Sequence, residues 1–89
     1  MTHITLEIVN EKGLHARASA KLVEVVEGFD ASAEITKDGM NASGDSIMGL
    51  LMLAAAKGSF MDVETSGPDA DALAGALTAL VADKFGEGM

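Results

Sequence analysis

The spacing of hydrophobic residues changes repeatedly along this chain, and this pattern constrains its fold more than any other feature. Four segments alternate apolar and polar residues, which is typical of half-buried β-strands; they are residues 2–9, 31–37, 40–43 and 60–66. Three segments repeat apolar residues at helical spacing; they are residues 16–27, a stretch from Asp45 or Ser46 through about Ala56, and a final stretch opened by Gly67-Pro68-Asp69. The order β-α-β-β-α-β-α predicts an α+β fold in which helices cover one face of a four-stranded antiparallel sheet.

Turn residues mark the expected ends of these elements. Gly28 should stop the first helix, Asp38-Gly39 is a strong hairpin signal, and Lys57-Gly58 should end the middle helix. The helix positions that we expect to be buried are Ala18, Leu22, Val25 or Val26, Phe29, Leu50, Leu53, Ala54, Leu73, Leu77, Leu80 and Val81. Phe85 should pack at the end of the chain, and residues 86–89 should fray.

Length and composition limit the class of protein. Residues 1–89 suffice for a single domain, and a hydrophobic fraction of 48% can supply its core. The chain has no cysteine, which excludes disulfides and thiolate metal sites, and we expect neither metal nor cofactor. No segment resembles a signal peptide or reaches the roughly 20 apolar residues of a membrane span. We therefore expect a cytoplasmic monomer without membrane insertion.

The charges are unevenly distributed. The net charge of −8 argues against binding to nucleic acid, which attracts basic surfaces. Three of the six positive charges nevertheless fall close together at Lys12, Arg17 and Lys21, and no acidic residue lies between Lys12 and Glu24. This locally basic patch suits a phosphate group or an acidic partner surface, although ordinary charge scatter is the alternative.

The stretch from Gly13 to Ala20, with sequence GLHARASA, carries the strongest sign of chemistry. It places His15 at the first turn of the predicted helix, where backbone N–H groups such as those of Ala16 and Arg17 lack intrahelical partners. Such a helix start binds anions, and a neighbouring arginine offers a planar guanidinium. A nucleophilic imidazole among these groups could hold a phosphoryl group. The alternative is a surface histidine that happens to precede a helix.

The middle helix contains more apolar residues than it can bury. If its core positions face inward, the side chains that stay exposed are Ile47, Met48, Leu51 and Met52. An exposed apolar cluster indicates an interaction surface, and methionine adapts to different partners. A deeper core than expected is the alternative. Ser46, just before this cluster, is a candidate helix cap.

These motifs together resemble the HPr family, the histidine-containing phosphocarriers of the bacterial phosphotransferase system. The family pattern Asn-x-x-Gly-Leu-His-Ala-Arg-Pro-Ala is matched from Asn10 onward, except that Ala18 replaces the proline. Further matches are the stretches SIMGLLML at 46–53 and AAKG at 55–58, and the resemblance spans essentially the whole chain. The segments 28–30 and 50–53 and the acidic, glycine-rich tail look more like the nitrogen-related branch than the sugar-uptake branch.

The resemblance implies an open-faced β-sandwich and a relay function rather than a free-standing enzyme. A phosphoryl group would pass from phospho-enzyme I to His15 and then to an enzyme IIA-type protein, with Arg17 neutralising charge on it. Partners would dock on the middle helix and on Lys12, Ala20 and Lys21. In some members the serine that matches Ser46 is phosphorylated by a dedicated HPr kinase/phosphorylase. Ala18 would loosen the helix start without removing a reacting group.

Two other functions fit parts of this pattern. A non-catalytic regulator could bind its target through the middle helix and be switched by phosphorylation of His15 or Ser46. A small ligand-binding domain of the ferredoxin-like class has nearly the same element order. That fold usually ends on its last strand, however, and gives no reason for pairing His15 with Arg17.

Overall fold

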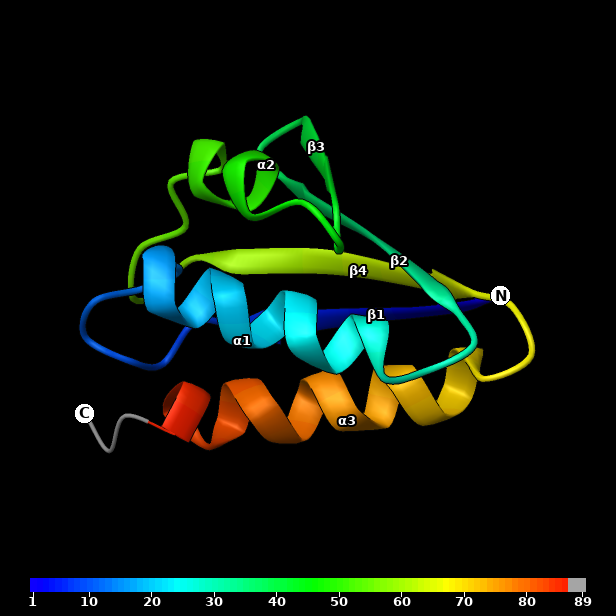
Figure 1. The fold of residues 1–89 in the computed structure, drawn as a ribbon. Helices are drawn as coiled ribbons and strands as arrows, with labels where there is room; N and C mark the ends of the chain where they lie inside the picture. Colours follow the sequence, from blue (N-terminus) through cyan, green and yellow to red (C-terminus); the bar gives the residue numbers. More distant parts are fainter. Residues whose placement is uncertain (87–89) are drawn as a thin grey trace.

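The computed structural model describes residues 1–86 and contains four strands and three α-helices in the predicted order (Figure 1). The elements are β1 (Thr2–Glu7), α1 (Ala16–Glu27), β2 (Ser32–Lys37), β3 (Met40–Ser43), α2 (Ile47–Met52), β4 (Phe60–Ser66), α3 (Ala70–Ala82) and a 3₁₀ turn η1 (Lys84–Gly86). The strands form one sheet in the order β1-β4-β2-β3, and all neighbours are antiparallel. The predicted α+β class is therefore confirmed.

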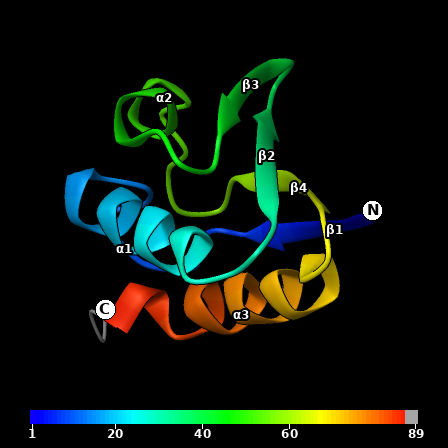
Figure 2. The same ribbon diagram turned by 45° about the vertical axis from the view of Figure 1, so that its right-hand side comes forward.

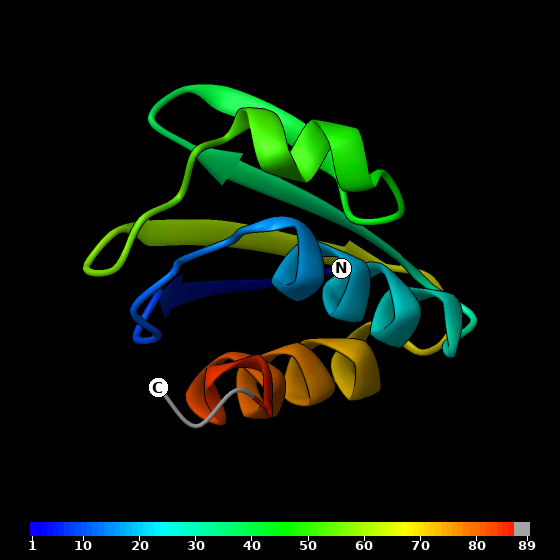
Figure 3. The same ribbon diagram turned by 60° about the vertical axis from the view of Figure 1, so that its left-hand side comes forward.

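The three helices lie on one side of the sheet and leave its other side open (Figure 3). Alternation along the strands produces this asymmetry, because successive side chains point to opposite faces. Ile35, Met61 and Val63 are fully or almost fully buried in the core, whereas Glu34 and Asp62 on the opposite face are exposed. The fold is thus the open-faced sandwich that the sequence predicted. Within residues 1–86, no helix is both long enough and apolar enough to cross a membrane.

The first helix and the β2–β3 hairpin agree with the sequence patterns. α1 has the predicted bounds, with Gly28 as its C-cap. The hairpin turns at Asp38 and Gly39, whose φ values of 51° and 80° are the left-handed values that a tight two-residue turn requires. Of the predicted α1 stripe, Val25 and Phe29 are only partly buried, whereas Ala18, Leu22 and Val26 are buried.

The middle helix is shorter than predicted. α2 ends at Met52 with Leu53 as its C-cap, and Ala54 leaves the helix with φ 52°. Ala54 is consequently exposed, and Ala55 is buried in its place. The helix stops early because the Ala55 carbonyl turns away to accept a hydrogen bond from Leu14 N–H at 2.8 Å. Gly58 therefore lies in the following turn. The prediction that Lys57-Gly58 ends the helix is wrong.

The segment that follows α3, up to Gly86, is anchored to α1. Phe85 is fully buried, and Lys21 Nζ donates a hydrogen bond to its carbonyl at 2.8 Å. Gly86, the first residue predicted to fray, instead closes η1 by donating its N–H to Asp83 O at 2.9 Å. The rest of that prediction, for 87–89, lies outside the described residues. On α3 the buried positions include Leu73, Leu77 and Val81, while Leu80 is partly buried.

Candidate functional site

His15 is the N-cap of α1, and its imidazole faces the helix backbone. Its φ of −80° and ψ of −175° are extended, and its Nδ1 accepts a hydrogen bond from Arg17 N–H at 3.2 Å. The His15 carbonyl accepts from Ser19 N–H at 2.8 Å, which begins the helical hydrogen-bond pattern. In a neutral imidazole the nitrogen that accepts a hydrogen bond carries the lone pair, so the proton lies on Nε2. Nδ1 therefore carries a lone pair that points to the start of α1.

The loop before His15 is fixed by close contacts with the segment after α2. Asn10 is fully buried and its Nδ2 donates to Gly13 O at 2.9 Å. Gly13 has φ 65°, and a Cβ there would lie 2.4 Å from the Ala55 carbonyl oxygen. Only glycine fits both this backbone conformation and this approach. With the Leu14–Ala55 hydrogen bond, these contacts hold His15 at a defined place on the surface.

Two polar residues support the loop in ways that the sequence analysis did not identify. Asn10 was noted only as the first residue of the family pattern, yet its side chain is buried and bonded within the loop. Ser19 is also fully buried, and its Oγ donates to Leu14 O at 3.3 Å. The spacing of Asn10 three residues before Gly13 is the signal that could have indicated the first contact, since asparagine often bonds to nearby backbone. Ser19 gives no such local signal.

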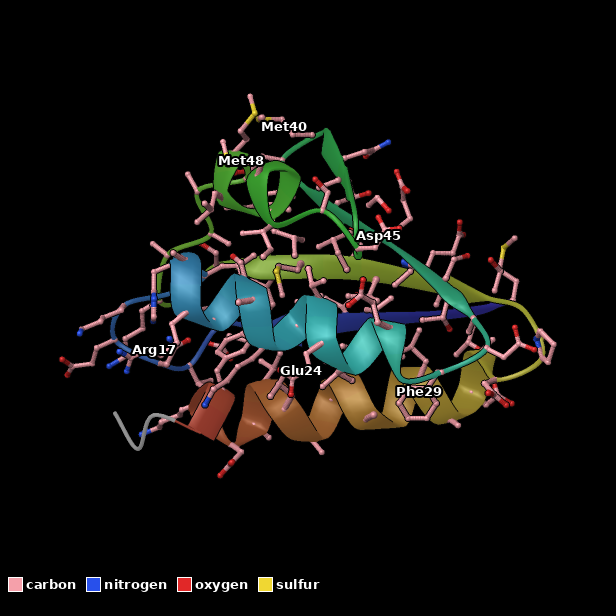
Figure 4. All side chains as sticks on the ribbon, in the orientation of Figure 1. Arg17, Glu24, Phe29, Met40, Asp45 and Met48 are labelled. Atoms are coloured by element: carbon pink, nitrogen blue, oxygen red, sulfur yellow. The ribbon has the colours of Figure 1, made fainter. Side chains whose placement is uncertain are left out.

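The basic residues around His15 differ in their surroundings. Arg17 and Lys12 are exposed, and Figure 4 shows Arg17 at the end of the molecule where α1 begins. Lys21, one turn further along α1, is partly buried by its hydrogen bond to the Phe85 carbonyl. Ala16 and Ala20 are exposed, so the start of α1 is open to solvent on this side.

We call Ile47, Met48, Leu51 and Met52 the α2 surface. Met48 and Met52 are 71% and 68% exposed, Ile47 is 40% exposed and Leu51 is partly buried, whereas Leu50 is fully buried. The helix therefore presents most of its apolar surplus to solvent, as the sequence predicted. α2 packs against α1 and lies beside the start of that helix, which the different views show (Figures 1 and 2).

Ser46 begins α2 as its N-cap. Its Oγ accepts a hydrogen bond from Gly49 N–H at 3.0 Å, and the residue is partly exposed. Asp45 beside it is exposed and accepts from Ser43 Oγ at 2.6 Å. The candidate helix cap Ser46 is thus the N-cap of α2 in the structure.

His15 lies outside two hollows in residues 1–86. One hollow of about 280 Å³ lies on the open sheet face and is lined by His3, Glu34, Thr36, Asn41, Asp62 and Glu64. Another of about 350 Å³ lies between α1 and α3 and is lined in part by Lys21 and Phe85. Within the same residues, no group of three or more histidine, cysteine or acidic side chains could hold a metal ion. A surface position for His15 suits a protein partner better than an enclosed small substrate.

Comparison with known proteins agrees with this arrangement. The family described as PTS HPr component phosphorylation site matches residues 2–83. The chain is 47% identical over 81 residues to phosphocarrier protein HPr of Cupriavidus necator, with 91% of each chain covered. It is 42% identical over 84 residues to phosphocarrier protein NPr of Escherichia coli, with 93% of each covered. A crystal structure of HPr from Thermoanaerobacter tengcongensis has a TM-score of 0.94 at 34% identity and covers 100% of both chains.

These matches include the loop of His15, both helices beside it and the whole sheet. The sequence relatives and the structural neighbour are phosphocarrier proteins of one kind, and their similarity extends over nearly the full length. The chain therefore belongs to the HPr family, the phosphocarrier proteins of the phosphotransferase system.

Proposed function

We propose that His15 Nδ1 accepts a phosphoryl group from phospho-enzyme I and passes it to an enzyme IIA-type protein. The observation that carries this proposal is the hydrogen bond from Arg17 N–H to His15 Nδ1 at 3.2 Å, because it directs the nucleophilic lone pair to the start of α1. In this role the protein is a relay that is phosphorylated and dephosphorylated by others, and it does not turn over a substrate alone.

The chemistry requires one bond to form and one to break. The Nδ1 lone pair attacks the phosphorus, and the bond between phosphorus and the donor's leaving atom breaks, with the electron pair going to that atom. In the second half of the relay, Nδ1 is the leaving atom and recovers its lone pair. A neutral ring with its lone pair on Nδ1 is the form that can begin this cycle.

The start of α1 supplies groups that stabilise the transferred phosphoryl. Once Nδ1 binds phosphorus it no longer accepts a hydrogen bond from Arg17 N–H, and that amide becomes free to donate to a phosphoryl oxygen. The Ala16 amide and the helix dipole favour negative charge at the same place. The exposed Arg17 guanidinium can neutralise charge on the transferring group, which is most of what a phosphoryl-transfer site must do.

The α2 surface and the nearby cations form the docking area in this proposal. An exposed apolar cluster beside the reactive residue can be covered by the same partner that reaches His15. Lys12 and Arg17 favour an approach by an acidic surface. Ala20 lies on the exposed side of α1 within the same area. The hydrogen bond of Lys21 to Phe85 gives that lysine a structural contact, which leaves Lys12 and Arg17 as the better candidates for steering.

A regulatory role is the second candidate, and the partly exposed position of Ser46 beside the α2 surface favours it. A phosphate on Ser46 would suit the positive end of a helix. It would also place charge at the rim of an apolar contact, next to Asp45. Modification by a kinase of the HPr kinase/phosphorylase type would then weaken docking without unfolding α2.

The test is incubation of the protein with enzyme I and phosphoenolpyruvate, followed by addition of an enzyme IIA-type protein. We expect acid-labile phosphate on this chain and its loss when the acceptor is added. Absence of uptake would contradict the relay and favour a purely binding role. The ferredoxin-like alternative does not hold, because the chain belongs to the HPr family. Its last strand is also followed by a helix, α3, which packs on β1 and β4.

A further inference from the structure

The methionines of this protein differ widely in their exposure to solvent. Met48 and Met52 on the α2 surface are 71% and 68% exposed, whereas Met61 on β4 is fully buried. We propose that Met48 and Met52 are modification sites, at which a peroxide forms methionine sulfoxide and thereby weakens partner docking. The inference rests on the proposed function, because it assumes that partners cover the α2 surface.

Helix geometry places the two thioethers on the same side of α2. Residues four positions apart lie one above the other on a helix. The opposite side of α2 is held by Leu50, which is fully buried, and Leu53, which is 3% exposed. Figure 4 shows Met48 on the outer side of α2, away from β4. An oxidant in solution therefore meets both sulfur atoms without any opening of the fold.

The modification needs only the thioether and a peroxide. A lone pair on the methionine sulfur attacks one peroxide oxygen, the O–O bond breaks, and the second oxygen leaves as water with the proton of the first. The sulfur loses two electrons and the peroxide gains them. Methionine sulfoxide reductases reverse the product, which makes the modification usable as a switch. Met61 can react only when the core opens, because its sulfur has no contact with solvent.

Oxidation changes the character of the surface without changing the reacting group. A flexible apolar side chain becomes polar, and a sulfoxide oxygen that a partner covers loses its water. Burial of an unpaired polar group is unfavourable, so we expect the affinity for enzyme I to fall about tenfold or more when both residues are oxidised. His15 is unaltered. The KM for this protein in the enzyme I reaction should therefore rise while the rate at saturation is retained.

Peptide mapping of the native chain after graded treatment with hydrogen peroxide tests the chemical part. We expect Met48 and Met52 to oxidise at least about tenfold faster than Met61, because these two are exposed and Met61 is buried. Thermal unfolding of the oxidised protein should be nearly unchanged. Oxidation of Met61 at the same rate as Met48 would overturn the assignment.

Matched variants connect the modification to docking. Met48→Leu combined with Met52→Leu keeps an apolar surface that cannot be oxidised. Met1→Leu removes a methionine that is 87% exposed at the N-terminus, which lies at the opposite end of the molecule from α2 (Figures 1 and 2). Peroxide should raise the KM of the wild type and of Met1→Leu but not that of the double variant. An equal rise in the double variant would overturn the proposal.

The relay and the modification can fail separately. If the untreated chain is labelled by enzyme I but complete oxidation of Met48 and Met52 leaves its KM unchanged, the modification proposal is wrong and the relay stands. If the untreated chain is not labelled, the relay is wrong. Calorimetric titration of enzyme I with treated and untreated chains then still decides whether oxidation weakens docking. Treatment with the reductases should restore the original KM.

Discussion

The two helices that meet beside the candidate site both begin with a side-chain N-cap, but they depend on it differently. At α1, His15 Nδ1 accepts from Arg17 N–H at 3.2 Å, and at α2, Ser46 Oγ accepts from Gly49 N–H at 3.0 Å. α1 has 12 residues and buries five of them, while α2 has six residues and buries one. Because core packing supplies most helix stability, α1 can persist without its cap, whereas α2 has little else to hold it.

This difference explains how one helix start can carry chemistry while the other supports structure. A cap that the fold does not need can bind and release another group, as a phosphoryl relay must. A cap on a helix of two turns instead contributes a large share of the stability of that helix. The comparison therefore predicts opposite effects for substitutions at the two caps.

Replacing the α1 cap should have the largest effect on function. We expect His15→Ala to abolish phosphorylation by enzyme I, because no other group takes the place of Nδ1. The free energy of unfolding should fall by less than about 1 kcal/mol, since the five buried residues of α1 remain. Phosphate labelling and urea denaturation of the same preparation measure both quantities. Undiminished labelling would show that another residue is the acceptor.

The two sides of α2 should respond oppositely to truncation. Leu50→Ala should lower the free energy of unfolding by roughly 2–5 kcal/mol, because it empties a core position. Met48→Ala and Leu51→Ala should leave unfolding nearly unchanged and weaken enzyme I binding, by about 1 kcal/mol or more if they lie at the centre of the contact. Titrations with denaturant and with enzyme I show whether each side chain contributes to the core or to docking. Large stability losses with unchanged affinity at Met48 would make α2 a core element only.

Arg17 should affect transfer more than stability. Arg17→Lys keeps the positive charge but loses the planar, multidentate guanidinium, so we expect transfer to slow about tenfold. The exposed side chain contributes little to the core, and the unfolding midpoint should stay close to that of the wild type. Rapid-quench measurement of phosphoryl transfer tests the rate. A sharp fall in the midpoint with normal transfer would assign Arg17 a structural role instead.

The α2 cap should show the smallest functional effect and a measurable structural one. Ser46→Ala should lower the free energy of unfolding by about 1 kcal/mol and leave labelling of His15 intact. Ser46→Asp retains a capping oxygen but adds charge at the rim of the α2 surface, so it should weaken enzyme I binding without unfolding the helix. Equal enzyme I affinity for the Asp variant and the wild type would remove the basis for regulation at Ser46.

Local signals predicted the parts of the fold that local chemistry determines. The bounds of α1 follow from a run of helix formers that ends at Gly28, and the hairpin follows from Asp38-Gly39. The position of His15 at a helix start could be predicted for the same reason. The hydrogen bond that His15 Nδ1 accepts as a cap could not be predicted, because the sequence does not determine which ring nitrogen faces the backbone.

The failures of prediction come from contacts between distant residues. The Ala55 carbonyl leaves the helical direction to bind Leu14 N–H, and this tertiary contact shortens α2 in a stretch whose composition favours helix. The hydrogen bond from Lys21 Nζ to a carbonyl 64 residues away was likewise not expected, while the part of Lys21 in partner docking stays a prediction. Neither contact can be predicted from the residues that neighbour it in the sequence.

The position of phosphorus on the imidazole of His15 is the most direct test of the relay. Long-range ¹H–¹⁵N NMR of the chain phosphorylated by enzyme I distinguishes the two ring nitrogens. The hydrogen bond from Arg17 N–H predicts phosphorylation of Nδ1 alone, with the proton retained on Nε2. Phosphorus on Nε2, or an unmodified His15 ring in a phosphorylated chain, would contradict the proposed site.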